Sequence, residues 1–194
     1  MKLLSCFLLF VALASCHKTN TATLNIGQFP NKIGDQWVYL VQDSLAHVND
    51  TLTVTVLSAG NLNGVASLLW QYSYSNGTVD TLQAITSNDT INYYTNPPFP
   101  TLSFALLFPI ASGSNWKDNS GGSYAVSSLG NYTYQGQNFT NLLTEAHTVQ
   151  SFDYSLIDDI YVQPNVGVAY RRTIEFSLGP AVYQVWTLIG YHLN

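Results

Sequence analysis

Strict alternation of apolar and polar side chains over short stretches is the feature that most constrains the fold of this chain. Residues 51–56 read Thr-Leu-Thr-Val-Thr-Val, and residues 70–75 read Trp-Gln-Tyr-Ser-Tyr-Ser. A period of two places every second side chain on the same side of an extended strand, so each stretch predicts a strand with one buried face. Asn76-Gly77 follows the second stretch and is typical of a tight hairpin turn.

The rest of the chain favours strands as well. No segment combines a helical period with capping residues, whereas Thr, Val, Tyr, Ser and Asn are abundant. About ten or eleven short strands are expected, which fits an all-β antiparallel sandwich or a strongly curved partial barrel. Residues 181–191 are apolar on both faces, and we expect this segment to lie centrally in the sheet.

The N-terminus has a different pattern. Lys2 is followed by an apolar run of about ten residues, which predicts a signal peptide over residues 1–15 because the run is too short to span a bilayer. Leu13-Ala14-Ser15-Cys16 resembles the lipobox of bacterial lipoproteins. The resemblance implies cleavage before Cys16 and attachment of a diacylglyceryl group to its thiol, with acyl chains such as palmitate. A membrane-anchor helix and an ordinary secretory peptide are the alternatives.

Cysteine usage and composition define the remaining organisation. Cys6 and Cys16 are the only cysteines, so the chain beyond Cys16 has neither a disulfide nor a thiolate metal site. Residues 16–28 are rich in Thr and Asn and are expected to form a flexible tether. Residues 29–194 are long enough to form a single β domain. By resemblance to lipoprotein sorting signals, His-Lys-Thr-Asn after Cys16 implies an outer-membrane location facing the periplasm.

One motif occurs twice with identical spacing. Phe-Pro-x-x-x-Gly-x-x-Trp is formed first by Phe29, Pro30, Gly34 and Trp37, and again by Phe108, Pro109, Gly113 and Trp116. The proline fixes an extended entry, the glycine allows a tight turn, and the tryptophan begins the next strand. We expect both tryptophans to be buried at equivalent strand starts and both phenylalanines to cover the sheet edge. The repeat indicates a duplicated half-domain or two equivalent corners of one sheet.

Further segments extend this pattern over nearly the whole chain after the signal peptide: Phe139-Thr140-Asn141-Leu142-Leu143, Asn165-Val166-Gly167-Val168-Ala169 and Trp186-x-Leu188-x-x-Tyr191. With the paired motif, they resemble a group of Gram-negative cell-envelope lipoproteins to which no activity is assigned. The resemblance therefore implies location and fold only.

Candidate catalytic and metal-ligating residues are few and scattered. Glu145 and the Asp158-Asp159 pair carry carboxylates suited to acid–base chemistry, although we interpret the pair as a solvated turn. Asp118-Asn119-Ser120-Gly121-Gly122 lacks both the partners of a protease nucleophile and the carboxylates of a calcium loop. Three histidines of the folded part have no close metal-ligand spacing: His47, His147 and His192. No catalytic residue, metal site or cofactor is predicted.

Partners and modifications follow from charge and short motifs. No basic patch is larger than Arg171-Arg172, which argues against nucleic-acid binding. The chain's 13 tyrosines and 4 tryptophans suit sugar-stacking or lipid-lining surfaces, or simply the core. Four sites resemble a bacterial O-glycosylation motif and equally suit turns that enter strands: Ser44, Thr51, Thr81 and Thr90.

The leading functional hypothesis is a non-catalytic lipoprotein of the cell envelope that acts as a binding or assembly module. Its partner would be an envelope protein, a glycan or a lipid, besides the membrane that holds the lipid on Cys16. A carrier of an apolar ligand and a hydrolase with an unrecognised site are the alternatives. An enclosed apolar cavity above roughly 300 Å³ would support the carrier, and a cleft with a histidine beside a carboxylate would support the hydrolase.

Overall fold

The computed structural model describes residues 23–117, 122–134, 136–150, 154–177 and 181–194. Its elements are β1 (Thr23–Leu24), the 3-10 helix η1 (Ile26–Gln28), β2 (Gln36–Asp43), β3 (Val48–Leu62), β4 (Val65–Tyr74), β5 (Val79–Ser87), β6 (Thr90–Tyr94), β7 (Leu102–Leu107), β8 (Ile110–Ala111), β9 (Asn115–Lys117), β10 (Ser123–Tyr134), β11 (Gln137–Gln150), β12 (Tyr154–Gln163), β13 (Gly167–Ser177) and β14 (Val182–His192).

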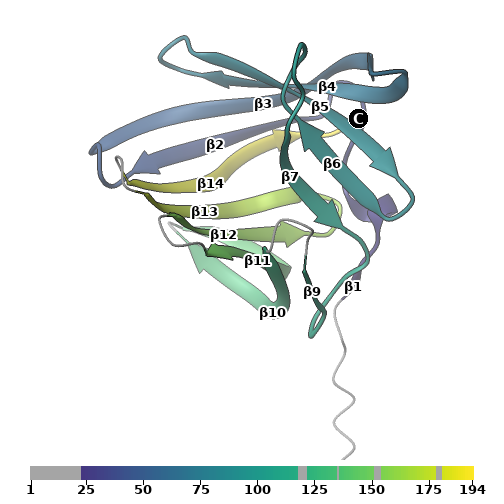
Figure 1. Ribbon diagram of the computed structural model, residues 1–194. Helices are drawn as coiled ribbons and strands as arrows, with labels where there is room; N and C mark the ends of the chain where they lie inside the picture. Colours follow the sequence, from purple (N-terminus) through teal and green to yellow (C-terminus); the bar gives the residue numbers. More distant parts are fainter. Residues whose placement is uncertain (1–22, 118–121, 135, 151–153, 178–180) are drawn as a thin grey trace, which may run out of the picture.

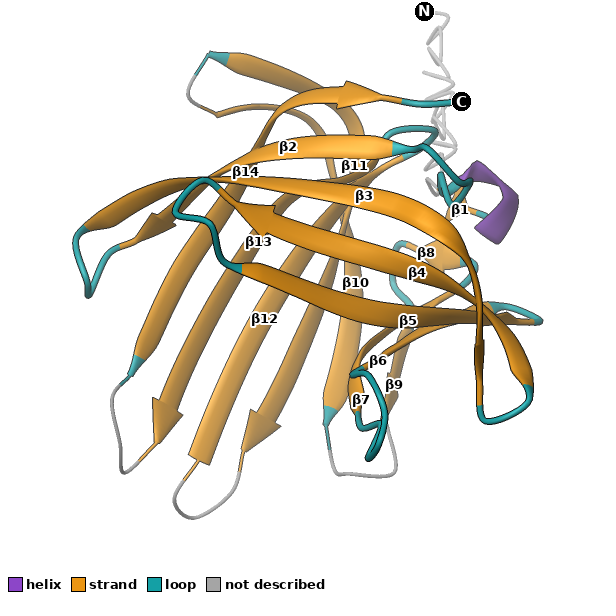
Figure 2. Ribbon diagram, turned by 90° about the horizontal axis from the view of Figure 1, so that it is seen from above, coloured by secondary structure: helices purple, strands orange, loops and turns teal. Residues whose placement is uncertain are grey.

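Twelve of these strands form one antiparallel sheet in the order β7-β6-β5-β4-β3-β2-β14-β13-β12-β11-β10-β9, and β1 pairs with β8 in a small second sheet. The large sheet bends back on itself, so that β3, β4 and β5 face β11 and β12 (Figure 1, Figure 2). Its edge strands β7 and β9 do not pair, so the described sheet stays open. The predicted all-β class with a curved, sandwich-like sheet is confirmed.

The strand order divides the sheet into two similar halves. Each copy of the repeated motif precedes a run of six consecutive antiparallel strands, β2–β7 after the first copy and β9–β14 after the second. The runs join where β14 pairs with β2, so the sheet reads β9 to β14 and then β2 to β7. This is the order that a tandem duplication produces, and it supports a duplicated half-domain.

The two turns of the motif have the same backbone geometry. Gly34 and Gly113 adopt φ of 92° and 88°, a region that favours glycine. The Gly34 amide donates to the Val56 carbonyl at 2.8 Å, and the Gly113 amide donates to the Val126 carbonyl at 2.9 Å. Each valine amide in turn donates to the carbonyl of the residue after the glycine. The shared spacing therefore encodes a shared turn.

The two tryptophans share their stacking but differ in burial. Trp37 stacks on Trp70, and Trp116 stacks on Tyr124, in both cases at 5.2 Å with planes 9° apart. Trp37 is 1% exposed and its Nε1 donates to the Val166 carbonyl at 2.6 Å, whereas Trp116 is only partly buried. The expected burial is confirmed for Trp37 and is wrong for Trp116, because β9 is a short edge strand with a neighbour on one side only.

The two phenylalanines of the motif contact each other instead of covering separate sheet edges. Both are buried, and the Phe29 and Phe108 ring centroids lie 5.8 Å apart. The predicted edge role is wrong because the two Phe-Pro entries converge in one place and their rings join the core. Pro30 follows a trans peptide bond, and Pro109 follows a cis bond.

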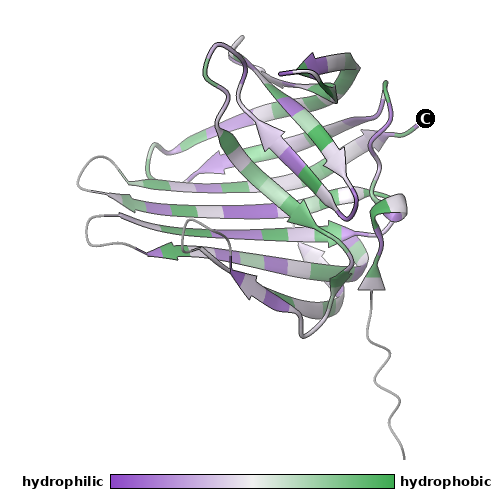
Figure 3. Cartoon of the chain, turned by 45° about the vertical axis from the view of Figure 1, so that its right-hand side comes forward, coloured by the Kyte–Doolittle hydropathy of each residue, from purple (hydrophilic) through white to green (hydrophobic). Residues whose placement is uncertain are grey.

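The core follows the alternation in the sequence. Leu52, Val54 and Val56 of β3 are at most 3% exposed, while the intervening threonines are partly exposed. Bands of alternating hydropathy run along the strands in Figure 3. The apolar segment predicted to be central is β14, which lies between β13 and β2 as expected.

The packed part of the chain begins before Phe29, at an earlier residue than predicted. Leu24 in β1 is fully buried, and η1 follows it directly, so the predicted tether is wrong over residues 23–28. The reason is that Leu24 and Ile26 supply apolar side chains that join the core. The predicted signal peptide, Cys16 and residues 118–121 of the Gly-rich loop lie outside the described residues. Among the helical residues that the structure describes, none forms a helix long and apolar enough to cross a membrane.

Candidate functional site

A row of polar side chains crosses the otherwise apolar concave face of the sheet. His147 of β11 is paired with Asp158 of β12, which is paired with Thr173 of β13, so the three side chains share a face. Glu145 lies two residues before His147 and is on the same face. The fold therefore brings together a histidine and two carboxylates that appear unrelated in the sequence. Across the described ranges, no three His, Cys, Asp or Glu side chains are grouped to hold a metal ion.

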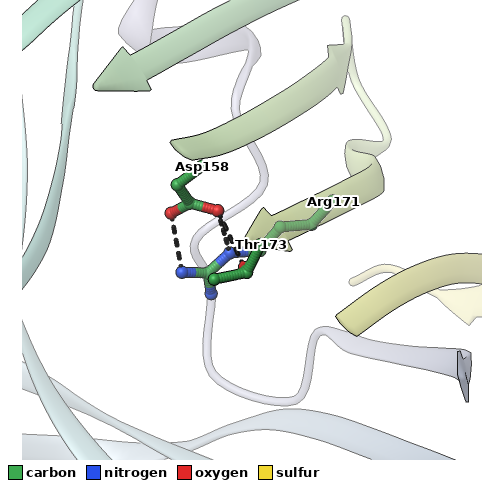
Figure 4. Close-up of polar contacts among 3 residues, drawn as sticks. All are labelled: Asp158, Arg171 and Thr173. Carbon is green, nitrogen blue, oxygen red and sulfur yellow. Dashed lines mark hydrogen bonds and ion pairs between the residues drawn. The ribbon is translucent and has the colours of Figure 1, made fainter. Parts of the chain in front are cut away.

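Arg171 and Asp158 form an ion pair within this row, in which Asp158 is buried and Arg171 is partly buried (Figure 4). Arg171 Nε donates to Asp158 Oδ1 and Nη2 donates to Oδ2, both at 2.8 Å, and the Thr173 hydroxyl donates to Oδ1 at 3.0 Å. Burial lowers the pKa of Arg171, but the charge and hydrogen bonds of Asp158 outweigh it, so the pKa lies above its ordinary value. The guanidinium is held in one orientation by this two-point contact.

Two aromatic rings enclose the same guanidinium. Arg171 Cζ lies 5.1 Å from the ring centroid of Phe104 and 5.1 Å from that of Trp186. These distances are within the range of cation–π attraction. Phe104 comes from edge strand β7 and Trp186 from central strand β14, so the contact joins two distant parts of the sheet.

The enclosed guanidinium lies in a cleft of about 540 Å³. The cleft is lined by Tyr72, Tyr74, Val79, Asp80, Thr81, Leu82, Thr95, Asn96, Ser103, Phe104, Arg171 and Trp186. A smaller apolar hollow of about 40 Å³ lies behind it and shares Tyr72, Phe104, Arg171 and Trp186. This hollow is far below the roughly 300 Å³ expected of an apolar ligand cavity. Among the described residues, no side chain or carbonyl accepts a hydrogen bond from Arg171 Nη1.

Glu145 is the most unusual acid in the row. It is fully buried, and neither carboxyl oxygen has a hydrogen-bond partner within the described part of the chain. Burial, with a smaller contribution from the charge of Asp158, raises the pKa of Glu145 to about 8. Glu145 is therefore largely protonated at neutral pH, and solvent does not reach it.

Asp159 and Arg172 form a second ion pair on the opposite face of the sheet. Neighbouring residues in a strand point to opposite sides, so Asp158 binds Arg171 inside and Asp159 binds Arg172 outside. The interpretation of Asp158-Asp159 as a solvated turn is wrong. Both residues lie within β12 and are at most 6% exposed, because each carboxylate has an arginine partner on β13.

The four candidate glycosylation residues occupy different environments. Ser44 is exposed in the turn after β2, where the Asp43 carboxylate accepts hydrogen bonds from the Leu45 and Ala46 amides. Three lie in strands and are partly buried: Thr51, Thr81 and Thr90. Their modification stays a prediction, and exposure favours Ser44.

One structural residue was not singled out in the sequence. Asp35 follows the glycine of the first motif copy and is 1% exposed. Its carboxylate accepts hydrogen bonds from the Lys32 amide at 2.8 Å and the Asn194 amide at 2.9 Å. Asp35 therefore links Asn194 to the first turn, and its position after a turn glycine was the only indication of this role in the sequence.

Neither a protein-family model nor a curated protein matches the chain. Solved structures similar to it include a "putative lipoprotein" from Parabacteroides distasonis, with 13% identity over 84% of this chain and 97% of that chain and a TM-score of 0.44. Another is a "putative exported protein with YmcC-like fold" from Bacteroides fragilis, with 11% identity over 84% of this chain and 98% of that chain and a TM-score of 0.40. A likeness this weak says nothing about the chemistry of the Arg171 cleft.

Proposed function

We propose that this chain is a lipid-anchored, non-catalytic protein of the cell envelope that binds a neutral, hydroxyl-rich ring compound such as a saccharide. The main support for this proposal is the cleft of about 540 Å³, which combines aromatic rings with hydroxyl, amide and carboxylate side chains. Ring faces of Trp186 and the tyrosines suit stacking on a sugar ring, while the polar side chains suit its hydroxyl groups.

The charge balance of the cleft favours a neutral ligand over an anion. Asp158 neutralises Arg171, and Asp80 adds a carboxylate to the lining. An anionic ligand would therefore meet no excess positive charge. Asp158 accepts hydrogen bonds only from Nε and Nη2 of Arg171. Nη1 is therefore a fixed donor that can form a hydrogen bond to a ligand hydroxyl.

The state of the carboxylates supports binding rather than hydrolysis. Both oxygens of Asp158 accept hydrogen bonds from Arg171, and one also accepts from Thr173. Glu145 is enclosed and has no route to a ligand in the cleft. A general acid or base must reach the reacting group within hydrogen-bond distance, and neither Asp158 nor Glu145 is placed to do so. Asp80 is the one carboxylate among the described residues that line the cleft, and neither a histidine nor a second carboxyl group lines the cleft with it.

Filling the cleft tests the binding proposal. Ser103→Trp places a large ring at an exposed lining position on edge strand β7, and Ser127→Trp is the matched control on exposed β10. Saturation-transfer NMR with neutral oligosaccharides released from bacterial envelopes should show contact with the wild-type protein and the control, and none with Ser103→Trp. Equal signals from both variants would refute the cleft as the site, and no signal from the wild type would refute saccharide binding.

The anchor has its own test. The lipobox resemblance supports lipidation of Cys16, and the His-Lys-Thr-Asn sequence after Cys16 supports a location in the outer membrane facing the periplasm. Cys16→Ser should abolish labelling by a fatty acid and release exported protein from membranes. Undiminished label in this variant would contradict lipidation, and removal of the protein by protease added to intact cells would contradict the periplasmic orientation.

A further inference from the structure

A second hollow lies on the concave face, at the opposite end of β4 from the Arg171 cleft. This groove measures about 650 Å³ and is lined by Ile26, Gly27, Asn31, Ala59, Ala66, Ser67, Leu68, Ala84, Thr86, Asn88 and Ile91. Its lining from β3, β4 and η1 is dominated by small or apolar residues, and a Cβ added to Gly27 would meet nothing within 4 Å. Because these side chains are small, they leave the groove wide.

Three of the four polar side chains that line this groove, all but Asn88, already have hydrogen-bond partners in the protein. Asn31 accepts a hydrogen bond from Trp70 Nε1 at 3.2 Å and donates to the Thr86 hydroxyl at 3.1 Å. The Ser67 hydroxyl donates to Gln83 Oε1 at 2.7 Å. None of the described residues that line the groove carries a charged side chain. Apart from Asn88 at the exposed rim, a polar ligand would find few free partners in exchange for its water, so the lining favours hydrocarbon.

The groove lies close along the chain to the predicted lipid. Ile26 and Gly27 form one wall, and the described chain begins at Thr23, three residues before Ile26. Cys16 precedes Thr23 by seven residues, a span of at most about 25 Å when extended. An acyl chain attached to Cys16 is therefore within reach of the groove.

We propose that this groove holds an acyl chain carried by Cys16. The inference rests on the lipid anchor proposed above and is independent of the Arg171 cleft. The groove is open to solvent along one side, so it covers part of the surface of a seated chain, whereas a bilayer covers all of it. The seated chain is partly shielded from water while the protein is away from a membrane, and it can leave the groove for the bilayer when the remaining lipid inserts.

Photocrosslinking in the lipidated full-length protein tests this placement. Cells are grown with a fatty acid that carries a diazirine in its chain, irradiated, and the protein is digested and analysed by mass spectrometry. We expect the lipid on Cys16 to crosslink to groove residues of β3, β4 and β5, such as Ala59, Leu68 and Ala84. Crosslinks only to phospholipid, to a second copy of the chain or to other surfaces would overturn the proposal.

Two variants sharpen the result. Ala66→Trp fills the groove at an exposed position, and Ala125→Trp is the matched control on the exposed face of β10. The groove crosslink should fall at least tenfold in Ala66→Trp and stay at the wild-type level in Ala125→Trp, with unchanged circular dichroism in both. Equal crosslinking in the two variants would refute the site. Absence of any lipid label on the wild-type protein would refute the anchor, whereas label without groove crosslinks would refute this inference alone.

Discussion

At the residue scale, the Arg171–Asp158 pair shows how a curved sheet tolerates charge in its interior. The bidentate contact, the Thr173 hydroxyl and two aromatic rings together replace the water that both groups lose. Removing one partner leaves the other charge largely buried and without its counter-ion. Removing both leaves no charge to compensate.

Asp158→Asn should therefore lower the free energy of unfolding by about 3–5 kcal/mol, measured by urea denaturation. The double variant Asp158→Leu/Arg171→Met should be more stable than Asp158→Asn. Asp159→Asn is the matched control, because the Arg172 side chain is 40% exposed and water can solvate it, and its cost should be about 1 kcal/mol. Equal costs for the two asparagine variants would contradict the difference in burial.

Glu145 makes stability depend on pH. Its pKa is about 8 in the folded protein and has an ordinary value of 4.5, so the folded state holds a proton that the unfolded chain releases. The resulting stabilisation is complete below pH 4.5 and is lost as the pH rises through 8. We expect the free energy of unfolding to fall by up to about 1.4 kcal/mol per pH unit in this window. Glu145→Gln should remove the decline, and an unchanged slope in this variant would assign it to another group.

The exposure of each candidate acceptor residue determines which of them can be glycosylated. Ser44 is exposed in a turn, whereas Thr51, Thr81 and Thr90 are partly buried in strands. A glycosyltransferase needs an accessible hydroxyl, so we expect glycan at Ser44 before the other three. Intact mass spectrometry of protein from the native host checks this, and a mass equal to lipid plus polypeptide would exclude modification at all four.

At the scale of elements, the repeated motif predicts different costs for the same substitution. Trp37→Ala should lower the free energy of unfolding by about 3–5 kcal/mol, because the ring is enclosed and its Nε1 bonds to the Val166 carbonyl. Trp116→Ala should cost less, because the ring is partly exposed on edge strand β9. Thermal melting of both variants checks the order, and equal shifts would indicate equivalent burial.

Strands were predictable because alternation is a local property. The burial of Leu52, Val54 and Val56 follows directly from the period of two, and the turns at Gly34 and Gly113 follow from their spacing. The difference between Trp37 and Trp116 was not predictable, because it depends on β2 being central and β9 being an edge. The contact between the Phe29 and Phe108 rings was also not predictable, since the distance between them depends on the shape of the whole sheet.

The Arg171 cleft was less predictable than the strands that form it. Arg171, Asp158 and Trp186 come from three neighbouring strands, but Phe104 comes from edge strand β7 and reaches Arg171 only through the curvature of the sheet. Sequence patterns identify which face of a strand is buried and contain no information on which distant strand folds over it. The sequence identifies Glu145 as a carboxylate. Its burial was not predictable, because it depends on the segments that pack around β11.

At the scale of the whole molecule, the two halves interlock instead of packing as separate domains. The Tyr39 hydroxyl donates to the Val168 carbonyl at 2.9 Å, and Trp37 contacts Val166 and lies against Gly167. One buried cluster includes residues from both six-stranded runs. Neither half can therefore bury its apolar face without the other, despite their similar strand order.

The molecule should accordingly unfold in a single cooperative transition. Far-UV circular dichroism reports on all strands, while fluorescence reports on Trp37 and Trp70 in the first half and Trp116 and Trp186 in the second. The two urea denaturation curves should coincide, and Trp37→Ala should shift both by the same amount because its contacts join the halves. Separate midpoints, or a shift confined to one probe, would show that each six-stranded run is stable by itself.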